Sequence, residues 1–379
     1  MSYNTVLEDT IMKNTKLNIT FLDFDDIKNP LLNAGQARAT LEVGSRLAKK
    51  GHTVQVISSK YQQYKDRMEN GLYYRHIGIS TPNIRLNNLI YIFSLPFVVP
   101  SIKTDVFLEC FTAPISTLFS PLWTKIPVVA IPTSFEADRF SKLYKLPFNL
   151  VEKVGLKIYK YALPYTDIFD SKFKEANPKI KTRIVPEGVG NEYFAIKKNK
   201  PEFILFLGRF DMGQKGIDLL LHSYAKVQSQ INFPLVLAGK GPDEEKIRQL
   251  IKELNLDSKV KIVGPAYGKK KFDLLSKALF VAFPSRHEGF SLFVLEAMAA
   301  ALLLVSFDIP SLKWLPKDSI YKAPMFDVNE YSKLLLKAAD KNKTISKGIS
   351  LRRIARKYTW EKVVTDYEDF LYDVKGGIS

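Results

Sequence analysis

Short apolar runs alternate with stretches of helical periodicity along most of the 379 residues, and this alternation constrains the fold more than any other feature. LNITFLDF (17–24) and HTVQVISS (52–59) have the length and composition of buried strands, and a helical stretch that ends at Gly51 lies between them. A strand, a helix and a second strand in this order form a βαβ unit. Repetition of that unit predicts a parallel sheet with helices on both faces.

Four further strands are predicted in the first half of the chain, at DVFLEC (105–110), PVVAIP (127–132), DIFDS (167–171) and TRIVPE (182–187). The longest apolar run, LIYIFSLPFVVPSI (89–102), contains two prolines. It is also shorter than the roughly 20 residues that a membrane-spanning helix needs. We therefore expect a soluble or peripheral protein.

The alternation starts again near residue 200 and predicts a second α/β domain. The expected fold class is α/β, with two doubly wound Rossmann-like domains that face an interdomain cleft. Because open α/β sheets bind ligands at the carboxyl ends of their strands, this cleft is the expected site. The strands of the second half are FILFLG (203–208), PLVLAG (234–239), KVKIVG (259–264), FVAFPS (280–285) and LLLVSF (302–307).

Charge and cysteine content limit which partners and which cellular location can be expected. The formal net charge is +17, and residues 1–190 carry 25 Lys and Arg against 17 Asp and Glu, while the remainder carries 31 against 22. An excess spread so evenly does not mark a nucleic-acid-binding tail, but a basic surface suits phosphorylated substrates or anionic lipid headgroups. The single cysteine, Cys110, excludes an internal disulfide, and the N-terminus lacks a signal-peptide pattern. A cytoplasmic location is therefore expected.

The segment GRFDMGQKGIDLLL (208–221) follows one predicted strand and opens a helix. Arg209 and Lys215 stand on either side of Gly213 within this loop. A strand-to-helix loop with two cations and exposed backbone N–H groups is suited to a diphosphate. Two solvated cations on an ordinary loop are the alternative interpretation.

A second segment, RHEGFSLFVLEAMAA (286–300), places two carboxylates around a mostly apolar helix. Glu288 lies in the loop before the helix, Ser291 is the expected N-cap, and Glu296 lies inside the helix. Burying Glu296 without hydrogen-bond donors would be costly, and the vicinal hydroxyls of a sugar are suitable donors. A surface glutamate on a half-exposed helix is the alternative.

Together the two segments resemble family 4 of the retaining glycosyltransferases, which have the GT-B fold. The motifs FLGRFDMGQKGIDLLL, LVLAGKGP, VKIVGPA and FPSRHEGFSLFVLEAMAA stand in the family's order and spacing, and the two glutamates reproduce its E-x7-E pattern. NAGQARATLEVGSRLAKKGHTVQVIS (33–58) resembles the family's glycine loop, helix and strand. The resemblance implies an acceptor-side domain at 1–195, a nucleotide-sugar-binding domain at 196–355, and a helix at 356–379 that crosses back to the first domain.

The resemblance also implies residue roles. Arg209 and Lys215 would hold the donor diphosphate and Glu288 would face the donor sugar, which makes these three the expected catalytic residues. Glu296 would bind the ribose, and Gly35 would approach the phosphates from the first domain, since its missing Cβ lets the backbone come close. Val263, Gly264 and Pro265 would contact the base, and the backbone of Phe290, Ser291 and Leu292 would contact phosphate and sugar.

The implied activity is transfer of a hexose from a UDP-, GDP- or ADP-sugar to a hydroxyl of a glycan or lipid-linked acceptor, with retention, in cell-surface polysaccharide or glycolipid assembly. No cofactor or metal is expected, because the sequence has no metal-ligand cluster and its four histidines are scattered. No nucleic-acid-binding module is recognisable, so nucleic acid is not an expected partner. A glycoside hydrolase would have no use for the diphosphate loop.

The sequence departs from the family on the acceptor side. Where the family often has a histidine, Thr133 follows PVVAIP, and Ser134 comes next. Their hydroxyls can form hydrogen bonds but cannot act as a cation or base near neutral pH. A catalytically impaired sugar-nucleotide-binding relative is therefore the alternative function.

Residues 139–165 mix lysines with aromatic and aliphatic side chains. This composition suits an anionic membrane surface or a lipid-linked acceptor, and it predicts peripheral contact with the inner face of the membrane. An ordinary helix pair near the acceptor cleft is the alternative.

Overall fold

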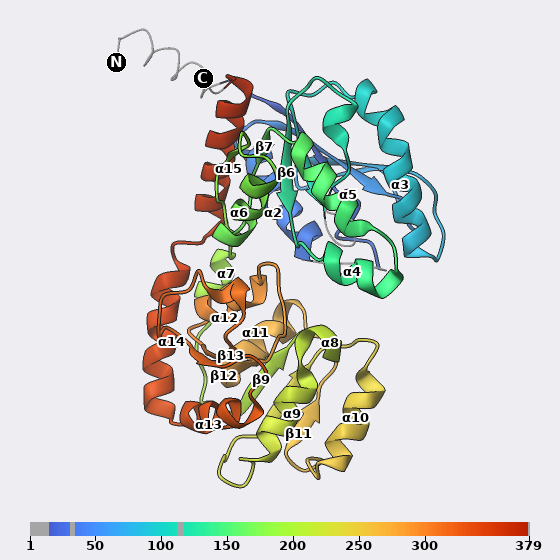
Figure 1. Cartoon of the computed structure of the whole chain (residues 1–379). Helices are drawn as coiled ribbons and strands as arrows, with labels where there is room; N and C mark the ends of the chain where they lie inside the picture. The colour runs from blue at the N-terminus through green and yellow to red at the C-terminus, as the bar shows by residue number, and fades with distance from the viewer. Residues whose placement is uncertain (1–14, 31–34, 112–116, 378–379) are drawn as a thin grey trace, which may run out of the picture. The chain divides into compact units, whose positions relative to one another are not determined.

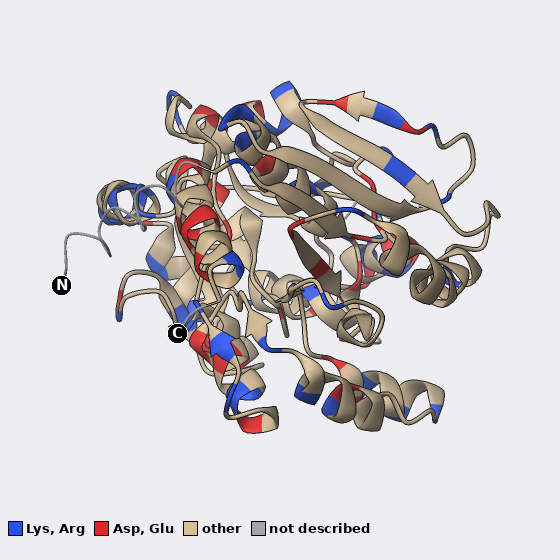
Figure 2. Cartoon of the chain, turned by 90° about the horizontal axis from the view of Figure 1, so that it is seen from above, with Lys and Arg blue, Asp and Glu red and all other residues tan. Residues whose placement is uncertain are grey.

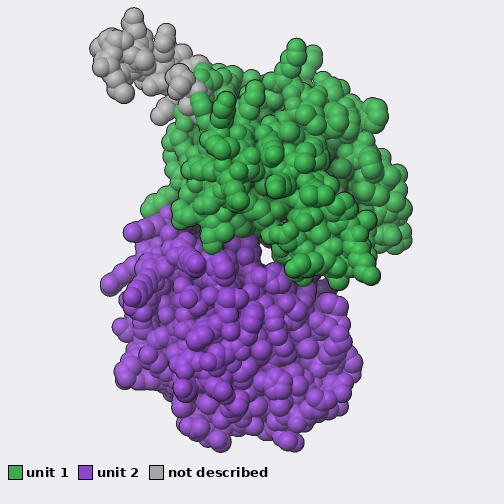
Figure 3. Space-filling view, viewed as in Figure 1, with its two compact units in different colours: residues 1–187, 360–379 green, residues 188–359 purple. Residues whose placement is uncertain are grey.

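The computed structural model describes residues 15–30, 35–111 and 117–377, and the chain divides into two compact units (Figure 3). The first unit consists of Met1–Glu187 together with Trp360–Ser379, and the second consists of Gly188–Thr359. Each unit contains its own sheet with helices packed on it. The first unit therefore takes its last helix from the far end of the chain.

The first unit is built on an eight-stranded sheet with the order β3-β4-β2-β1-β5-β6-β7-β8. All neighbouring strands are parallel except β3, which is antiparallel to β4. Apolar runs such as β5 are buried along their whole length, as expected for a parallel sheet covered on both faces. The strands are β1 (Asn18–Leu22), β2 (Thr53–Ser59), β3 (Arg67–Glu69), β4 (Leu72–Ile77), β5 (Val106–Phe111), β6 (Val128–Pro132), β7 (Tyr161–Ala162) and β8 (Lys181–Thr182).

The last helix of the chain lies beside the first described one in this unit (Figure 1). Arg46 of that first helix donates hydrogen bonds to Glu361 of the last, at 3.2 and 3.1 Å, and His52 lies 2.9 Å from Glu368. The longer helices of the unit are α2 (Gly35–Lys49), α3 (Ile84–Val98), α4 (Ala137–Tyr144), α5 (Phe148–Gly155), α6 (Asp167–Ala176) and α15 (Trp360–Lys375).

Two strand predictions in the first half are wrong in whole or in part. DIFDS (167–171) begins α6 instead of a strand, because the Thr166 hydroxyl caps the helix by accepting from the Phe169 N–H at 3.3 Å. TRIVPE (182–187) contributes only its first residue to β8. The β3–β4 hairpin was not predicted.

The second unit is built on an all-parallel six-stranded sheet with the order β11-β10-β9-β12-β13-β14. Four of its first five strands fall within the apolar runs that predicted them, while β12 starts at Ala278, two residues before the predicted run 280–285. β12 is buried at every position. Both sheets confirm the α/β fold class. The strands are β9 (Phe203–Leu207), β10 (Leu235–Ala238), β11 (Val260–Ile262), β12 (Ala278–Phe283), β13 (Leu303–Phe307) and β14 (Tyr321–Ala323).

Lys and Arg are spread over the ribbon without gathering in one segment (Figure 2). Across residues 15–30, 35–111 and 117–377, no helix combines the length and apolar character needed to cross a bilayer.

The helices of the second unit are α7 (Asn191–Phe194), α8 (Met212–Lys215), α9 (Ile217–Ala225), α10 (Glu244–Glu253), α11 (Gly268–Lys277), α12 (Leu292–Ala299), α13 (Val328–Ala338) and α14 (Lys341–Ala355).

A buried carboxylate, Asp26, fastens the β3–β4 hairpin to the carboxyl end of β1. Its two oxygens accept hydrogen bonds of 2.7 Å from the Arg67 guanidinium, and the His76 Nε2 lies 2.8 Å from one of them. Burial alone would raise the pKa of Asp26, but the hydrogen bonds from Arg67 and His76 outweigh it and hold the pKa well below its usual range. The position of the hairpin thus depends on a charge pair 41 residues apart in sequence.

We predict that Asp26→Asn lowers the free energy of unfolding at pH 7 by about 3 kcal/mol, because Arg67 keeps a largely buried charge and loses its buried carboxylate partner. Its remaining partner, Glu69 at 2.6 Å, is 25% exposed. A carboxylate with a depressed pKa stabilises the fold above its unfolded pKa of about 4 and loses this effect as the pH falls below it. The difference from wild type should therefore narrow in acid. Urea unfolding at neutral and acidic pH measures both effects.

Asp66→Asn is the matched control, since Asp66 contacts the other nitrogen of His76 at 2.9 Å but its side chain is 44% exposed. The loss at this position should stay below about 1 kcal/mol. Equal losses for the two variants would contradict the role assigned to Asp26.

Candidate functional site in the second unit

The site residues of the second unit gather where the order of its strands reverses. From β9 the chain winds outward through β10 and β11, and it then returns to β12, which pairs with the other side of β9. The connections after β9 and β12 therefore leave the sheet in opposite directions. In open α/β sheets such a switch point is where ligands bind, in a crevice at the carboxyl ends of the strands, and we call this place the β9–β12 crevice. Residues 208–216 and 284–291 follow these two strands.

The first of these segments forms the short helix α8 and turns back at Gly216. Asp211 caps α8 by accepting from the Gln214 N–H at 3.0 Å, and Gly216 adopts a left-handed conformation with φ of 63°. A Cβ at Gly216 would lie 2.1 Å from the carbonyl oxygen of Pro284. Only glycine allows the two loops to approach this closely.

Lys215 and Glu288 meet across the two loops. The Lys215 Nζ donates to the Glu288 Oε1 at 2.6 Å, and the Ser285 hydroxyl donates to the same oxygen at 2.7 Å. The lysine side chain is 19% exposed and the glutamate side chain 8% exposed. The structure therefore brings together two of the three residues expected to be catalytic, at the edge of solvent.

Arg209 lies in the same loop but points to a different partner. Its Nη2 donates to Asp211 at 2.8 Å and to Gln214 at 3.0 Å, and its side chain is 59% exposed. An exposed ion pair of this kind contributes little to stability. The guanidinium can therefore move to a phosphate at small cost.

Arg286 joins the two loops, although the sequence analysis gave it no role. Its guanidinium donates to Asp218 at 2.7 and 2.8 Å and to the Met212 carbonyl at 2.5 Å. The hydrogen bonds that Arg286 donates to Asp218 raise the pKa of Arg286 above its usual value. In the sequence, Arg286 was visible only as a charge beside Glu288, because its partner lies 68 residues away.

Glu296 lies in the second turn of α12 and is held by two donors from other elements. The Tyr193 hydroxyl of α7 donates to its Oε1 at 2.6 Å, and the Lys271 Nζ of α11 donates to its Oε2 at 2.5 Å. The glutamate and the lysine are 15% and 16% exposed. From the sequence we expected a ribose to supply the hydrogen-bond donors for Glu296. The two protein donors, Tyr193 and Lys271, were not predicted.

The segment expected to contact the base follows β11 and is fastened by the neighbouring lysine of α11. The Lys270 Nζ donates to the carbonyls of Val263 at 2.6 Å and Pro265 at 3.1 Å. Gly264 has φ of 71°, and a Cβ there would meet open space. Because Lys270 and Lys271 are consecutive, one turn of α11 contacts both this segment and Glu296.

The start of α12 has no side-chain cap, and the aromatic ring that precedes it is stacked. Ser291 is the N-cap residue, as expected, but its side chain makes no capping hydrogen bond, and the helix begins at Leu292. The Phe290 ring stacks on Trp314 with centroids 5.2 Å apart. The first N–H groups of α12 therefore lie beside the loop that carries Glu288.

The remaining predicted residues belong to the first unit. Gly35 begins α2, and the preceding Asn33 and Ala34 of the quoted glycine loop lie outside the described residues. Thr133 follows β6, and its hydroxyl donates to the Phe111 carbonyl at 3.4 Å. Ser134 lies between β6 and α4.

A metal site is not formed by the side chains placed in the structure. In the described part of the chain, no group of three or more His, Cys, Asp and Glu residues is arranged to hold a metal ion. The polar groups that converge at the β9–β12 crevice are instead Lys215, Glu288 and Ser285.

Comparison with solved structures identifies the fold. The chain superimposes on sucrose-phosphate synthase from Thermosynechococcus elongatus with a TM-score of 0.75, at 17% identity, over 92% of this chain and 97% of that one. The architecture is therefore the GT-B fold of glycosyltransferases, as the sequence predicted.

One family model matches most of the second unit. Residues 191–346, less than half of the chain, match the model described as glycosyl transferases group 1. The resemblance drawn from the sequence motifs is thereby confirmed.

Two curated relatives match parts of the chain. One is an N-acetylgalactosamine-N,N'-diacetylbacillosaminyl-diphospho-undecaprenol 4-alpha-N-acetylgalactosaminyltransferase of Campylobacter jejuni, 34% identical over 32% of this chain and 32% of that protein. The other is a GDP-mannose:cellobiosyl-diphosphopolyprenol alpha-mannosyltransferase of Xanthomonas oryzae, 24% identical over 68% of this chain and 70% of that protein. The aligned part thus spans about a third of the first relative's length.

We predict that Arg286→Ala lowers the free energy of unfolding of the second unit by about 2 kcal/mol, because Asp218 and the Met212 carbonyl lose charge-assisted hydrogen bonds in a partly buried site. Denaturant unfolding followed by intrinsic fluorescence measures the change. Arg248→Ala is the control, since Arg248 is 49% exposed and pairs with Glu244 one turn away on α10. Its loss should be under about 0.5 kcal/mol, and an equal effect of the two substitutions would show that Arg286 does not fasten the loops.

Proposed function

We propose that the protein transfers a hexose from a nucleotide-diphosphate sugar to a hydroxyl of a lipid-linked glycan, with retention at the anomeric carbon. The observation that carries the proposal is the contact of 2.6 Å between Lys215 and Glu288 at the β9–β12 crevice. A cation for a departing diphosphate and a carboxylate for sugar hydroxyls stand there side by side.

The chemistry requires little of the protein beyond positioning and charge. The bond between the anomeric carbon and the diphosphate oxygen breaks, and the electron pair leaves with the diphosphate. Lys215 and Arg209 would stabilise that charge, helped by the N–H groups at the start of α12. The acceptor oxygen forms the new bond to the anomeric carbon, and its proton passes to the departing diphosphate oxygen. Glu288, still held by Ser285 when Lys215 turns to the phosphate, would orient the sugar hydroxyls.

Nucleotide recognition would use the pair of segments that α11 joins. The ribose hydroxyls would bind Glu296 and displace or share Lys271, since carboxylates accept from vicinal hydroxyls. The base would lie against Val263, Gly264 and Pro265, where the open space beside Gly264 leaves room for it. UDP-, GDP- and ADP-sugars all have the ribose and diphosphate that these residues would contact. No metal or cofactor is proposed for the reaction, because Lys215 and Arg209 would supply the positive charge that the departing diphosphate needs.

The names of two relatives support a proposal for the acceptor and the location. Both relatives are named for acceptors attached through a diphosphate to a polyprenol, which favours a lipid-linked acceptor in glycolipid or polysaccharide assembly. Such an acceptor is held at a membrane, so we propose a cytoplasmic protein that contacts the inner face of the membrane peripherally.

A catalytically impaired sugar-nucleotide-binding protein is the second candidate. The observation that favours it is Thr133 at the position of the family's histidine, with its hydroxyl directed to the Phe111 carbonyl. Assays of transfer and of donor hydrolysis over a panel of sugar nucleotides separate the two candidates. Tight donor binding with neither activity would favour the second.

We predict that Lys215→Ala and Glu288→Gln each lower the transfer rate by about 10²–10³-fold, the usual effect of removing one group that stabilises transition-state charge. Product formation from a radiolabelled donor measures the rate, and thermal unfolding confirms that the variants remain folded. Lys333→Ala is the control, because Lys333 is 73% exposed on α13 and pairs only with Glu330 among the interactions found. Full activity of either site variant would refute the assignment.

We also predict that one class of sugar nucleotide stabilises the protein selectively. A donor present at 100 times its Kd adds about 2.7 kcal/mol to the native state, which corresponds to a rise in Tm of roughly 5 °C or more for a unit of this size. Thermal-shift measurement with UDP-, GDP- and ADP-sugars identifies the base. Glu296→Gln should abolish most of the shift, and a shift that this substitution leaves intact would remove the ribose assignment.

A further inference from the structure

The helix α3 exposes a row of large apolar side chains. Leu86, Leu89, Phe93 and Phe97 are 40%, 46%, 64% and 82% exposed, and their spacing of three or four residues places them on one face. Arg85 is the only charged residue of the helix. This helix contains most of the apolar run noted in the sequence, and it is too short to span a bilayer.

The helix pair α4–α5 exposes a second apolar row. Leu143, Leu146, Leu150 and Val154 are 63%, 53%, 60% and 59% exposed. Together with Tyr144 and the four residues of α3, they make up nine of the 22 large apolar side chains that are exposed among the described residues. Exposed apolar side chains concentrated in this way mark an interaction site.

The two rows meet at the aromatic residues of α4. The Arg85 guanidinium at the start of α3 lies over the Tyr144 ring, 5.6 Å from its centroid. Tyr144 in turn stacks on Phe140 at 5.9 Å and contacts Phe148 of α5 edge-on at 6.2 Å. The start of α3 and the end of α4 therefore lie side by side. We call the exposed faces of α3, α4 and α5 together the interfacial surface.

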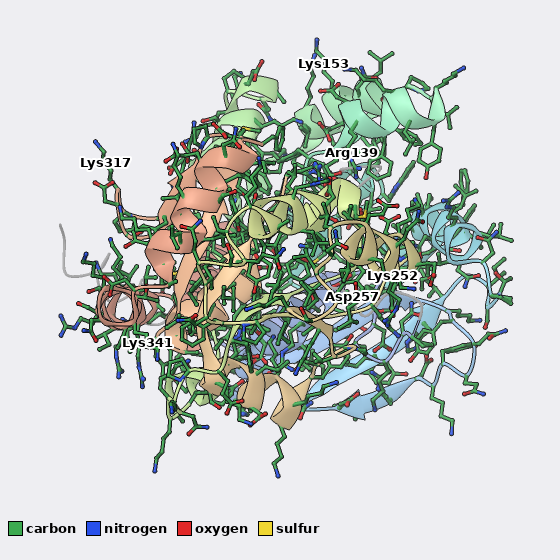
Figure 4. The ribbon with its side chains drawn as sticks, turned by 90° about the horizontal axis from the view of Figure 1, so that it is seen from below. Arg139, Lys153, Lys252, Asp257, Lys317 and Lys341 are labelled. Atoms are coloured by element: carbon green, nitrogen blue, oxygen red, sulfur yellow. The ribbon has the colours of Figure 1, made fainter. Side chains whose placement is uncertain are left out.

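The charges on the interfacial surface are mostly positive. Among residues 137–157 the two acids are Asp138 and Glu152, and Glu152 is buried and paired with Lys172. Figure 4 shows the Lys153 side chain extending away from the ribbons. The exposed cations of this stretch are Arg139, Lys142, Lys145, Lys153 and Lys157.

This combination selects one occupant. Apolar side chains among exposed lysines match a monolayer whose headgroups are anionic, since the former enter the acyl boundary and the latter contact the phosphates. A second copy of the chain would bring the same lysines against one another, and like charges repel. We propose that the interfacial surface docks the first unit onto an anionic lipid bilayer, with Phe93 and Phe97 as its deepest side chains.

The inference deepens the proposed membrane contact by naming the surface that makes it. It rests on the proposed function only for the side of the membrane concerned, because docking needs neither donor nor turnover. If the chain binds vesicles but does not transfer sugar, the docking proposal holds and the proposed function fails. If the chain transfers sugar but does not bind vesicles, the docking proposal fails and the proposed function holds.

Flotation of the full chain tests the proposal, with vesicles of phosphatidylglycerol and phosphatidylcholine compared with phosphatidylcholine alone. We expect the chain to float with the anionic vesicles at low salt and to dissociate at high salt, where the charges are screened. The double variant Phe93→Ser and Phe97→Ser should weaken binding at least about tenfold, because two aromatic side chains no longer enter the lipid. The double variant Lys142→Glu and Lys153→Glu should weaken binding to the anionic vesicles more than the phenylalanine variant does. The binding that remains should no longer depend on salt.

Ile345→Ser with Ile349→Ser is the matched control, since both residues are 47% exposed and one turn apart on α14 of the other unit. It should float as the wild type does. Failure of the wild-type chain to float at low salt, equal binding to neutral vesicles, or normal flotation of the phenylalanine variant would each overturn the proposal. A dimer in solution that the phenylalanine substitutions dissociate would show that the surface binds a second copy instead.

Discussion

The constraint on which the site depends is the pairing of β9 with β12, two strands about 70 residues apart in the chain that become neighbours in one parallel sheet. Because the winding direction reverses between them, their carboxyl ends form the topological switch point of this sheet. The loops that leave these strands are residues 208–216 and 284–291. Arg209, Lys215 and Glu288, the side chains proposed to contact the donor diphosphate and sugar, all come from these two loops.

Close approach of the two loops then determines which side chains meet. Gly216 lets the first loop contact the Pro284 carbonyl, and Arg286 reaches back across the junction to Asp218. Each loop supplies hydrogen-bond partners that the other would lack in isolation, so the junction is held by groups that would be costly to leave unpaired. The contact between Lys215 and Glu288 follows from this junction and lies at its solvent edge.

Much of the fold could be predicted from local sequence. A strand of a parallel sheet that is covered on both faces is an apolar run of five or six residues, whichever strands pair with it. DIFDS (167–171) shows the limit of that rule, since a capping threonine before it selects a helix. The run at 89–102 shows another limit. Nothing in its composition indicates that Phe97 is 82% exposed, because exposure depends on what packs against the helix and not on its own residues.

The sequence by itself determined the α/β class and the approximate positions along the chain of five of the six strands in the second unit. It also determined the presence of two cations and a carboxylate in strand-to-helix loops and of a second carboxylate in a helix. These are local properties of spacing and composition. Only the tertiary structure decided the partners of those groups. Glu296 is held by Tyr193 and Lys271, which lie 103 and 25 residues away, and Arg286 is held by a residue 68 positions earlier. The physical reason is that hydrogen bonds and ion pairs act over about 3 Å, so they depend on which strands become neighbours and not on distance along the chain.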